Sequence, residues 1–417
     1  MKWCSVDQDE AHTIGQRLRM IRRRRGLGLA VAAGLAGMSK QYLSQLERGE
    51  RGFNRRGLLD DLAEAIGCSV ADLTGQPYHL PDRQSADVAA AVAGISRALH
   101  DTTLDDVPDV PARLLSELAR ATVVAHAYID DAQYGLAGQG IADLLVGLHV
   151  LVVTGSSEER RCALVGLAEA CKVAYVLAKR TGQIELAGVA AQRGLDAARL
   201  AERPDLVGML EMSRTSTLIG LGARRRAVVV CGQTLRELSA LPGPAPEDTR
   251  VAEACGMLHL TAALIATRDG RPGDVATHFA EAQSLAAHTG ERNHMRYHFG
   301  PTNVAAWQLG LAVEAGAGLD IAQRLAAAPI DLSVFGSKGR VAYVHFDLAR
   351  AWAQAKGRRD LDAVRALDTA DRLAPVRLRN DPMARELLSV LHRRAPRRVW
   401  ELDSLLNRFG IGKVSNL

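Results

Sequence analysis

Residues that favour β-sheets are scarce in this chain. Only 4% of the 417 residues are aromatic, and runs of β-branched residues are few, whereas alanine, leucine and arginine recur throughout. Alanine, leucine and arginine are good helix formers, while aromatic and β-branched residues are the usual strand formers. The composition therefore predicts an all-α protein with almost no strand. Its length predicts more than one domain or a repeat array.

Signals for export or membrane insertion are also lacking. The first ten residues contain three acidic side chains, where a signal peptide needs a basic start followed by an apolar run. The longest apolar stretch, Ile141–Val153, has 13 residues and includes Asp143 and His149. It is therefore too short and too polar to cross a bilayer. We expect a cytoplasmic protein with no membrane partner.

Motifs for catalysis or metal binding are a third absence. The six cysteines form no Cys-x-x-Cys pair, and there is no P-loop, nucleophile elbow, zinc-protease motif or dinucleotide fingerprint. His294 and His298 have the i, i+4 spacing of metal ligands, but their motif offers no third ligand. Gly135, Gly138 and Gly140 are interpreted as a turn, because no strand precedes them and no Walker lysine follows. We expect buried free thiols, no metal, no cofactor and no enzyme.

Positive charge is concentrated near the N-terminus. The whole chain carries a formal net charge of +5, but His12 to Gly57 contains 11 basic residues and only two acids, Glu47 and Glu50. The rest of the chain holds 41 basic and 45 acidic residues. A short, strongly basic segment of this kind is typical of proteins that bind a phosphate backbone.

Helical periodicity predicts five short helices in this N-terminal segment. Apolar residues recur at helical spacing, and glycines or capping hydroxyls mark most of the ends. The predicted elements cover residues 13–25, 29–35, 40–47, 58–66 and 69–73. Pro77 and Pro81 stand among polar residues, so we expect a linker over 76–85 between an N-terminal domain (1–75) and a second domain (86–417).

Longer helices are predicted to fill the second domain. Alternate helices start about 37 to 53 residues apart, which is typical of stacked helix pairs. The predicted helices lie near 86–101, 111–135, 139–153, 157–181, 183–202, 205–221, 223–240, 248–269, 272–289, 301–315, 318–328, 338–356, 359–373 and 382–394. The last clear pair resembles the tetratricopeptide (TPR) pattern of small and large residues closed by a proline. That resemblance is carried by Leu348, Ala349, Trp352, Ala363, Leu367, Ala370 and Pro375.

The string GLGLAVAAGLAGMSKQYLSQLERGER, Gly26 to Arg51, resembles the phage-repressor-type (XRE) helix-turn-helix family. The resemblance implies a small five-helix DNA-binding domain whose second motif helix enters the major groove. It also implies an ion pair between Glu47 and Arg22 that holds this helix in place. By the same resemblance, base edges are contacted by Lys40, Gln41 and Gln45, with Ser44 beside them.

The chemistry of these side chains fits DNA recognition. A lysine donates to guanine O6 and N7, and a glutamine pairs with adenine N6 and N7. Phosphates are expected to be contacted by Arg48, Arg51, Arg55, Arg56 and the Tyr42 hydroxyl. The alternatives are that Lys40, Gln41 and Gln45 are ordinary surface residues and that Arg22–Arg25 form a solvated helix end.

A DNA-binding head joined to TPR-like repeats is similar to the RRNPP-type quorum-sensing regulators, whose repeats bind a signalling peptide. The string FGPTNVAAWQLGLAVEAG, Phe299 to Gly316, is similar to actinobacterial XRE regulators with repeats. Asn303 is our first candidate for a ligand contact, because a carboxamide both donates and accepts hydrogen bonds. Its alternative role is to cap the helix after Pro301. Further candidates are Arg214, Glu211, Arg296 and Gln308.

The predicted function is a homodimeric transcriptional regulator. Its head would bind double-stranded DNA, and its α-solenoid would sense a signalling peptide or another small molecule. The alternative is a scaffold protein whose basic head binds nucleic acid without sequence preference.

Overall fold

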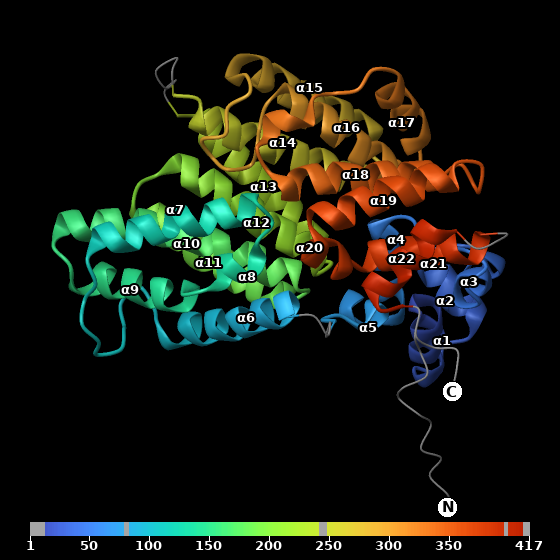
Figure 1. The fold of residues 1–417 in the computed structure, drawn as a ribbon, viewed down its shortest axis with the longest axis horizontal. Helices are drawn as coiled ribbons and strands as arrows, with labels where there is room; N and C mark the ends of the chain where they lie inside the picture. Colours follow the sequence, from blue (N-terminus) through green and yellow to red (C-terminus); the bar gives the residue numbers. More distant parts are fainter. Residues whose placement is uncertain (1–12, 79–82, 242–247, 396–398, 412–417) are drawn as a thin grey trace, which may run out of the picture.

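The structure is a computed structural model that describes residues 13–78, 83–241, 248–395 and 399–411. Every regular element in these ranges is a helix, which confirms the predicted all-α fold (Figure 1). Five short helices form an N-terminal head, and longer helices form an array after it. Cys4 lies outside the described residues, and the other five cysteines are free thiols. Cys171, Cys231 and Cys255 are buried as expected, whereas Cys68 is half-buried and Cys162 is exposed.

The head is close to its prediction. Its helices are α1 (Ile14–Arg24), α2 (Leu29–Leu35), α3 (Lys40–Glu47), α4 (Arg56–Ile66) and α5 (Val70–Thr74). Thr13 and Gln16 form a capping box at α1, and the Ser39 side chain accepts a hydrogen bond from the Tyr42 backbone N–H at α3. The helices enclose a small core in which Leu18, Leu43 and other leucines are fully buried.

The array begins with ten helices that pack mainly on their neighbours in sequence. They are α6 (Arg83–Asp101), α7 (Leu115–Asp130), α8 (Tyr134–Gly138), α9 (Ile141–Thr154), α10 (Ser157–Arg180), α11 (Ile184–Leu200), α12 (Pro204–Gly220), α13 (Arg224–Ser239), α14 (Arg250–Arg268) and α15 (Pro272–Thr289). A Cβ on Gly194 of α11 would lie only 2.8 Å from Cβ of Cys171 on α10. Glycine therefore permits the close approach of this helix pair.

The second part of the array completes the chain. It comprises α16 (Pro301–Ala315), α17 (Gly318–Ala327), the 3₁₀ helix η1 (Leu332–Phe335), α18 (Lys338–Ala353), α19 (Asp360–Leu373), α20 (Pro375–Arg379), α21 (Pro382–Arg394) and α22 (Trp400–Phe409). The sequence analysis did not predict α20, α22 or η1. These elements are short, and α22 follows residues that lie outside the described part.

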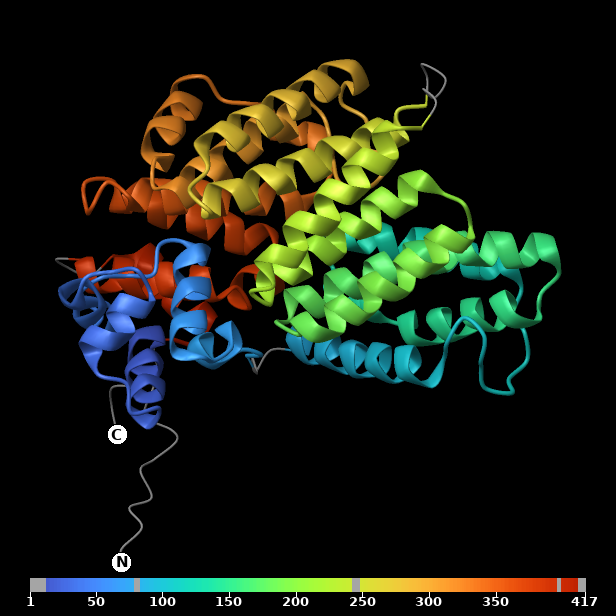
Figure 2. The same ribbon diagram turned by 180° about the vertical axis from the view of Figure 1, so that it is seen from behind.

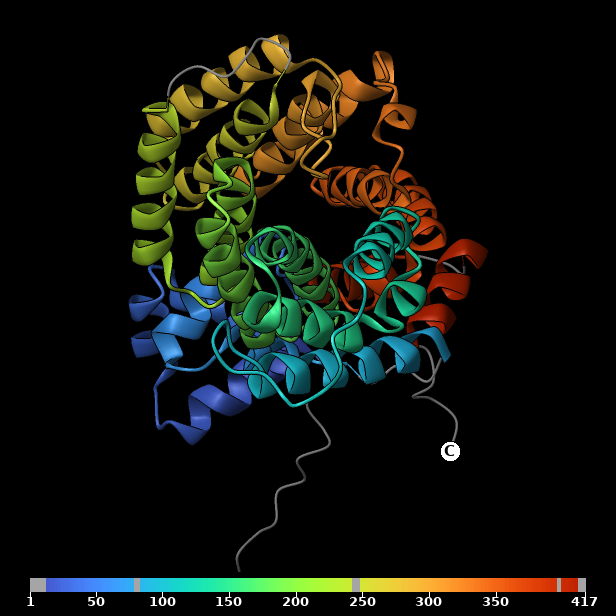
Figure 3. The same ribbon diagram turned by 90° about the vertical axis from the view of Figure 1, so that its left-hand side faces the viewer.

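The array curls until its early and late helices meet. Figure 3 shows the helices following one another around a ring. The contact is made by the α7–α8 turn and the start of α18, where Lys338 Nζ lies 2.6 Å from Asp131 Oδ1. Beside it, the fully buried Tyr134 packs against Gly339. This closure encloses a central cavity.

Two local predictions need correction. The expected linker 76–85 is only partly a linker, because α6 begins at Arg83 and Gln76 Nε2 donates a hydrogen bond to the Asn380 carbonyl. Residues 79–82 lie outside the described part. The expected turn at Gly135–Gly140 is mostly the short helix α8, followed by Gly140 in a left-handed conformation.

Among the described residues, one helical segment is long and apolar enough to cross a membrane. It is Tyr134–Thr154, which contains α8 and α9, and 61% of its apolar window is buried inside the protein. The segment packs against α6, α7 and α10. Its hydrophobicity is accounted for by the core of the array.

Candidate nucleic-acid interface and central cavity

Helix α3 is held firmly from its inner side. Leu43 and Leu46 are fully buried beneath it. A Cβ on Gly15 of α1 would lie 2.2 Å from the Leu46 carbonyl oxygen, so α1 and α3 touch through their backbones. The predicted pair is confirmed: Arg22 Nε and Nη2 donate to Glu47 Oε1 and Oε2 at 2.5 and 2.8 Å. The Glu47 carboxylate is the main reason that the pKa of the buried Arg22 guanidinium is raised.

The outer side of α3 carries the four base-reading candidates. Lys40 and Gln41 are exposed, and Ser44 and Gln45 are half-buried. In the described part of the chain, the side chains of Lys40, Gln41 and Gln45 make no hydrogen bond or ion pair. The Ser44 hydroxyl accepts a hydrogen bond from Arg48 Nη1. The first three side chains can therefore meet an outside partner without breaking an internal contact.

Most of the phosphate-contact candidates lie on the same exposed edge. Arg48 pairs with Glu50 at 2.5 Å, with both side chains about half exposed. The Arg51 guanidinium lies 5.1 Å from the centre of the Tyr42 ring, and Arg55 is exposed just before α4. An exposed ion pair contributes little free energy, so Arg48 can exchange Glu50 for a phosphate at small cost.

Arg56 is the exception, and its expected role is corrected here. Its Nη2 atom lies 2.5 Å from Asp381 Oδ2, and its backbone N–H donates to Glu314 Oε2 at 3.1 Å. Burial of Arg56 disfavours its charge, but the carboxylates of Asp381 and Glu314 outweigh that effect and raise its pKa. Arg56 faces the interior of the array and is not available to a phosphate in this arrangement.

Comparison with known families gives one match. Residues 13–74, which span α1 to α5, match the family model described as a helix-turn-helix domain. This segment is a helix-turn-helix DNA-binding domain. Searches among characterised proteins and among solved structures give no match.

The helix-turn-helix domain is docked on the array through a network of ion pairs. Figures 1 and 2 place it beside α21 and α22 at one end of the molecule. On α4, Asp60 pairs with Arg268 at 3.1 Å, and Asp61 pairs with Arg224 at 2.6 Å. Arg350 pairs with Glu314 at 2.7 Å and donates to the Asn54 carbonyl at 3.2 Å. The domain and the array therefore form one continuous structure.

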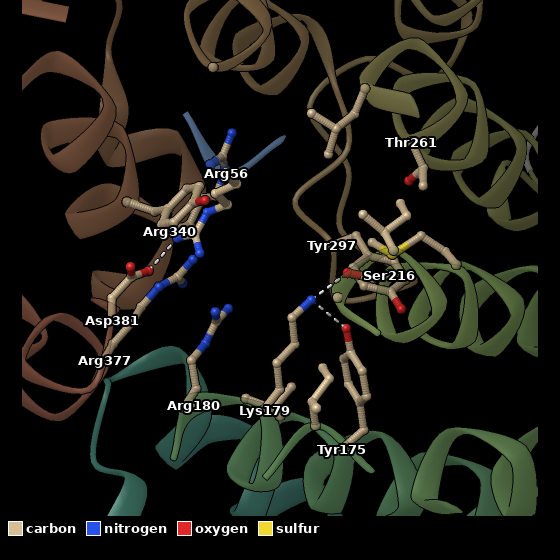
Figure 4. A pocket seen from close by; sticks show the side chains of 18 of the residues that line it. Arg56, Tyr175, Lys179, Arg180, Ser216, Thr261, Tyr297, Arg340, Arg377 and Asp381 are labelled. Carbon is tan, nitrogen blue, oxygen red and sulfur yellow. Dashed lines mark hydrogen bonds and ion pairs between the residues drawn. The ribbon is translucent and has the colours of Figure 1, made fainter. Parts of the chain in front are cut away.

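A cavity of about 440 Å³ lies at the centre of the array, and α4 forms part of its wall. Arg56, Leu59 and Asp60 of the helix-turn-helix domain line it, together with the inner faces of α10, α12, α14, α16 and α18. Figure 4 shows Arg56 on one side of the cavity and Lys179, Tyr175 and Ser216 on another. This volume suits a small organic molecule.

Two of the predicted ligand contacts line this cavity. Asn303 and Arg296 are both in its wall. Asn303 is buried on α16, where its Nδ2 donates to the Tyr297 carbonyl at 3.0 Å and its Oδ1 accepts from Arg340 Nε at 2.8 Å. The alternative role of Asn303 as a helix cap is wrong, because Gly300 is the N-cap of α16.

The other three predicted ligand contacts do not reach the cavity. Glu211 is buried and pairs with Arg214 at 3.0 Å, so each satisfies the other within α12. Gln308 is exposed, although it belongs to the same helix as Asn303. The sequence could not separate these residues from Asn303, because that requires knowing which face of each helix points inward.

The two histidines with metal-like spacing have other partners. His294 Nδ1 lies 2.8 Å from Glu253 Oε1, and His298 Nε2 lies 3.4 Å from Asp130 Oδ1. Among the described residues, no group of three or more His, Cys, Asp or Glu side chains is arranged to hold a metal ion.

Sequence reasoning missed the polar residues that face the cavity from the remaining helices. They include Lys172, Lys179 and Arg180 on α10, Arg340 on α18 and Arg377 on α20. In the sequence, these residues look like ordinary positions on charged helix faces. Only the closure of the ring brings them together.

Proposed function

We propose that the protein is a sequence-specific transcriptional regulator of XRE type. Its TPR-like array senses a small signal, and this controls promoter binding by a cytoplasmic homodimer. In this proposal, residues 1–75 bind DNA, residues 76–82 connect the two parts, and the array from α6 onward binds the ligand and forms the dimer. The observation that carries the proposal is that α4 of the helix-turn-helix domain is also a wall of the central cavity.

The DNA-binding part of the proposal rests on α3. Its outer side presents the exposed Lys40 and Gln41 and the half-buried Gln45, and exposed arginines lie at its C-terminal end. Lysine and glutamine can distinguish bases in the major groove, whereas arginines at the edge fix the register through phosphates. In a dimer, two such helices would read half-sites about one DNA turn, or a multiple of it, apart.

The ligand-sensing part of the proposal rests on the wall that the central cavity shares with the helix-turn-helix domain. Glu314, Asp381 and Arg268 hold α4, and all three line the cavity. A ligand that binds there contacts the groups that fix the position of the helix-turn-helix domain. It shifts the DNA-binding equilibrium only if it binds one docking arrangement more tightly than another.

Selection of bound duplexes from a randomised pool tests the DNA-binding part. We expect enrichment of a sequence with two related half-sites, bound at least 100-fold more tightly than a scrambled duplex at the same salt concentration. The scaffold alternative predicts no enrichment and equal affinity for both duplexes, with a steep dependence on salt. Light scattering on the complex with the selected duplex would show whether two copies bind together.

A further inference from the structure

The chemical class of the signal can be inferred from charges in the cavity wall, an inference that rests on the proposed function. Three arginines from separate helices point into the cavity: Arg180 at the end of α10, Arg340 on α18 and Arg377 on α20 (Figure 4). In the part of the chain that the structure describes, none of the three forms an ion pair with a carboxylate. Three guanidinium groups therefore share one cavity without a counter-charge in direct contact.

Their existing partners are few and neutral. Arg340 Nε donates to Asn303 Oδ1 at 2.8 Å, and Arg377 Nη1 donates to the Gly339 carbonyl at 2.9 Å. The Arg377 guanidinium also lies 4.3 Å from the centre of the Tyr343 ring. Arg180 makes no hydrogen bond within the described residues, and the buried Nε atoms of Arg180 and Arg377 have no acceptor. Several N–H donors in this cluster thus remain unsatisfied.

The carboxylates in the cavity wall are already engaged elsewhere. Asp381 pairs with Arg56, Glu314 and Asp347 pair with Arg350, and Asp60 pairs with Arg268, while Asp130 Oδ1 lies 3.4 Å from His298 Nε2. They cannot form ion pairs with the three arginines without giving up these contacts. An anion from outside the chain can supply a counter-charge in direct contact with the cluster.

Burial makes this arrangement costly for the unliganded protein. Burial, together with the nearby charge of Arg180, lowers the pKa of Arg377 to about 10. Burial also lowers the pKa of Arg340; the Asp347 carboxylate offsets only part of this effect, and the charge of Arg180 adds a smaller lowering. A bound anion would reduce the repulsion between the guanidinium groups and would accept hydrogen bonds from their free N–H groups. Arginine is well suited to bind carboxylates and phosphates, because its N–H groups form a planar fork.

The rest of the cavity is largely apolar. Met212, Met257 and Trp307 lie in one packed cluster with Tyr297 and line the cavity. A cavity of about 440 Å³ with this lining has room for more than an inorganic ion. Lys179, which donates to the Tyr175 hydroxyl at 2.9 Å and to Ser216, supplies a further polar contact.

We propose that the cavity binds a small amphipathic organic anion. Its carboxylate or phosphate group is held by Arg180, Arg340 and Arg377, and its apolar body packs against Met212, Met257 and Trp307. The acidic group could belong to the C-terminus of a short apolar peptide, to a simple organic acid or to a phosphate ester. All three present anionic oxygens that accept hydrogen bonds from arginine.

Calorimetric titration of the full chain with matched probes tests this proposal. The probes are octanoate, octyl phosphate, 1-octanol, inorganic phosphate, and acetyl-trileucine with a free or an amidated C-terminus. We expect at least one of the three acidic organic probes to bind at least tenfold more tightly than its neutral counterpart and than inorganic phosphate. Tighter binding by the free peptide identifies a peptide source, and tighter binding by the octyl anions identifies a simple acid or ester.

Variants connect the binding to the cluster. Arg180→Gln and Arg377→Gln should each weaken binding of the best anion at least tenfold, whereas Arg97→Gln, at an exposed position on α6, should leave it unchanged. Without ligand, Arg180→Gln should melt at the same or a higher temperature than the parent protein, because it removes repulsion. The proposal is overturned if no acidic organic probe binds at least tenfold more tightly than both its neutral counterpart and inorganic phosphate, or if both variants keep the parent affinity. Since calorimetry needs no DNA, these failures are separate from a failure of sequence-specific DNA binding.

Discussion

Arg56 and Asp381 lie 325 positions apart in the chain, yet Nη2 of Arg56 is 2.5 Å from Oδ2 of Asp381. Arg56 is the first residue of α4, and Asp381 is the N-cap of α21, where its other oxygen accepts the Met383 N–H at 2.9 Å. The pair thus joins the helix-turn-helix domain to the late helices of the array at the wall of the cavity.

Breaking this pair should loosen the docking of the helix-turn-helix domain. Arg56→Leu leaves the Asp381 carboxylate without its cation, and we expect a loss of roughly 2 to 3 kcal/mol in the free energy of unfolding. The loss is measured by denaturant unfolding of the full chain. Arg55→Leu, one position earlier and exposed, is the matched control and should change stability by less than about 0.5 kcal/mol. Equal losses in the two variants would contradict the assigned role of the pair.

For DNA binding, the order of the two arginines should be reversed: replacing Arg55 should have an effect, and replacing Arg56 should not. Arg55→Ala removes a proposed phosphate contact, so the slope of log affinity against log salt should fall by about 1. Arg56→Ala should leave this slope unchanged, because Arg56 faces the cavity. The measurement is a salt titration of affinity for one duplex. A lower slope for Arg56→Ala with an unchanged slope for Arg55→Ala would contradict the assignment of Arg56 to the cavity and of Arg55 to the DNA-facing surface.

The Arg22–Glu47 pair should be a major support of α3. Glu47→Ala leaves a buried guanidinium unpaired, and we expect it to cost about 3 to 5 kcal/mol in stability. Replacing both residues, as Arg22→Met with Glu47→Leu, should recover most of that loss because no buried charge remains. Denaturant unfolding of Glu47→Ala measures the first loss, and unfolding of Arg22→Met, Glu47→Leu and the double variant measures the coupling between the two residues. A loss below about 1 kcal/mol for Glu47→Ala would show that the pair is not structural.

His149 should make the array sensitive to mild acid. Burial lowers its pKa from 6.5 to about 4; its Nδ1 donates to the Leu145 carbonyl, and its Nε2 accepts from Arg193, both at 2.7 Å. The unfolded chain therefore binds a proton more readily than the folded chain, and stability falls as the pH drops from about 6.5 to about 4. The loss should reach about 3 kcal/mol.

Comparison with His149→Gln isolates this effect from other titrating groups. The variant cannot take up the proton, so the difference in stability between parent and variant should change by about 3 kcal/mol between pH 7 and pH 4. Unfolding curves at several pH values give this difference. A difference that stays constant with pH would show that His149 does not titrate as its surroundings imply.

Most helices could be predicted from the sequence because their signals are local. The predicted segments 29–35, 40–47, 272–289, 301–315 and 382–394 agree with α2, α3, α15, α16 and α21 at both ends. Caps, prolines and glycines set these boundaries, and apolar spacing set the buried faces. The pair between Arg22 and Glu47 was also predictable, because a family resemblance supplied the long-range contact.

The cavity could not be predicted, because it depends on how the array closes. Arg56 has the same local signature as its neighbour Arg55, yet one faces inward and the other outward. Along the chain, 160 positions separate Arg180 from Arg340, and 37 separate Arg340 from Arg377. No local sequence pattern relates the three arginines. Whether such residues meet is decided by the contact of the α7–α8 turn with α18.

The most direct test of the central claim is the contribution of the outer side of α3 to DNA affinity. The selected duplex and a scrambled duplex are titrated, at one salt concentration, with the parent protein, the triple variant Lys40→Ala, Gln41→Ala, Gln45→Ala, and Gln308→Ala as a control on the array. The account predicts that the triple variant loses at least about 100-fold in its preference for the selected duplex, while the control keeps it. An unchanged preference in the triple variant would contradict the account.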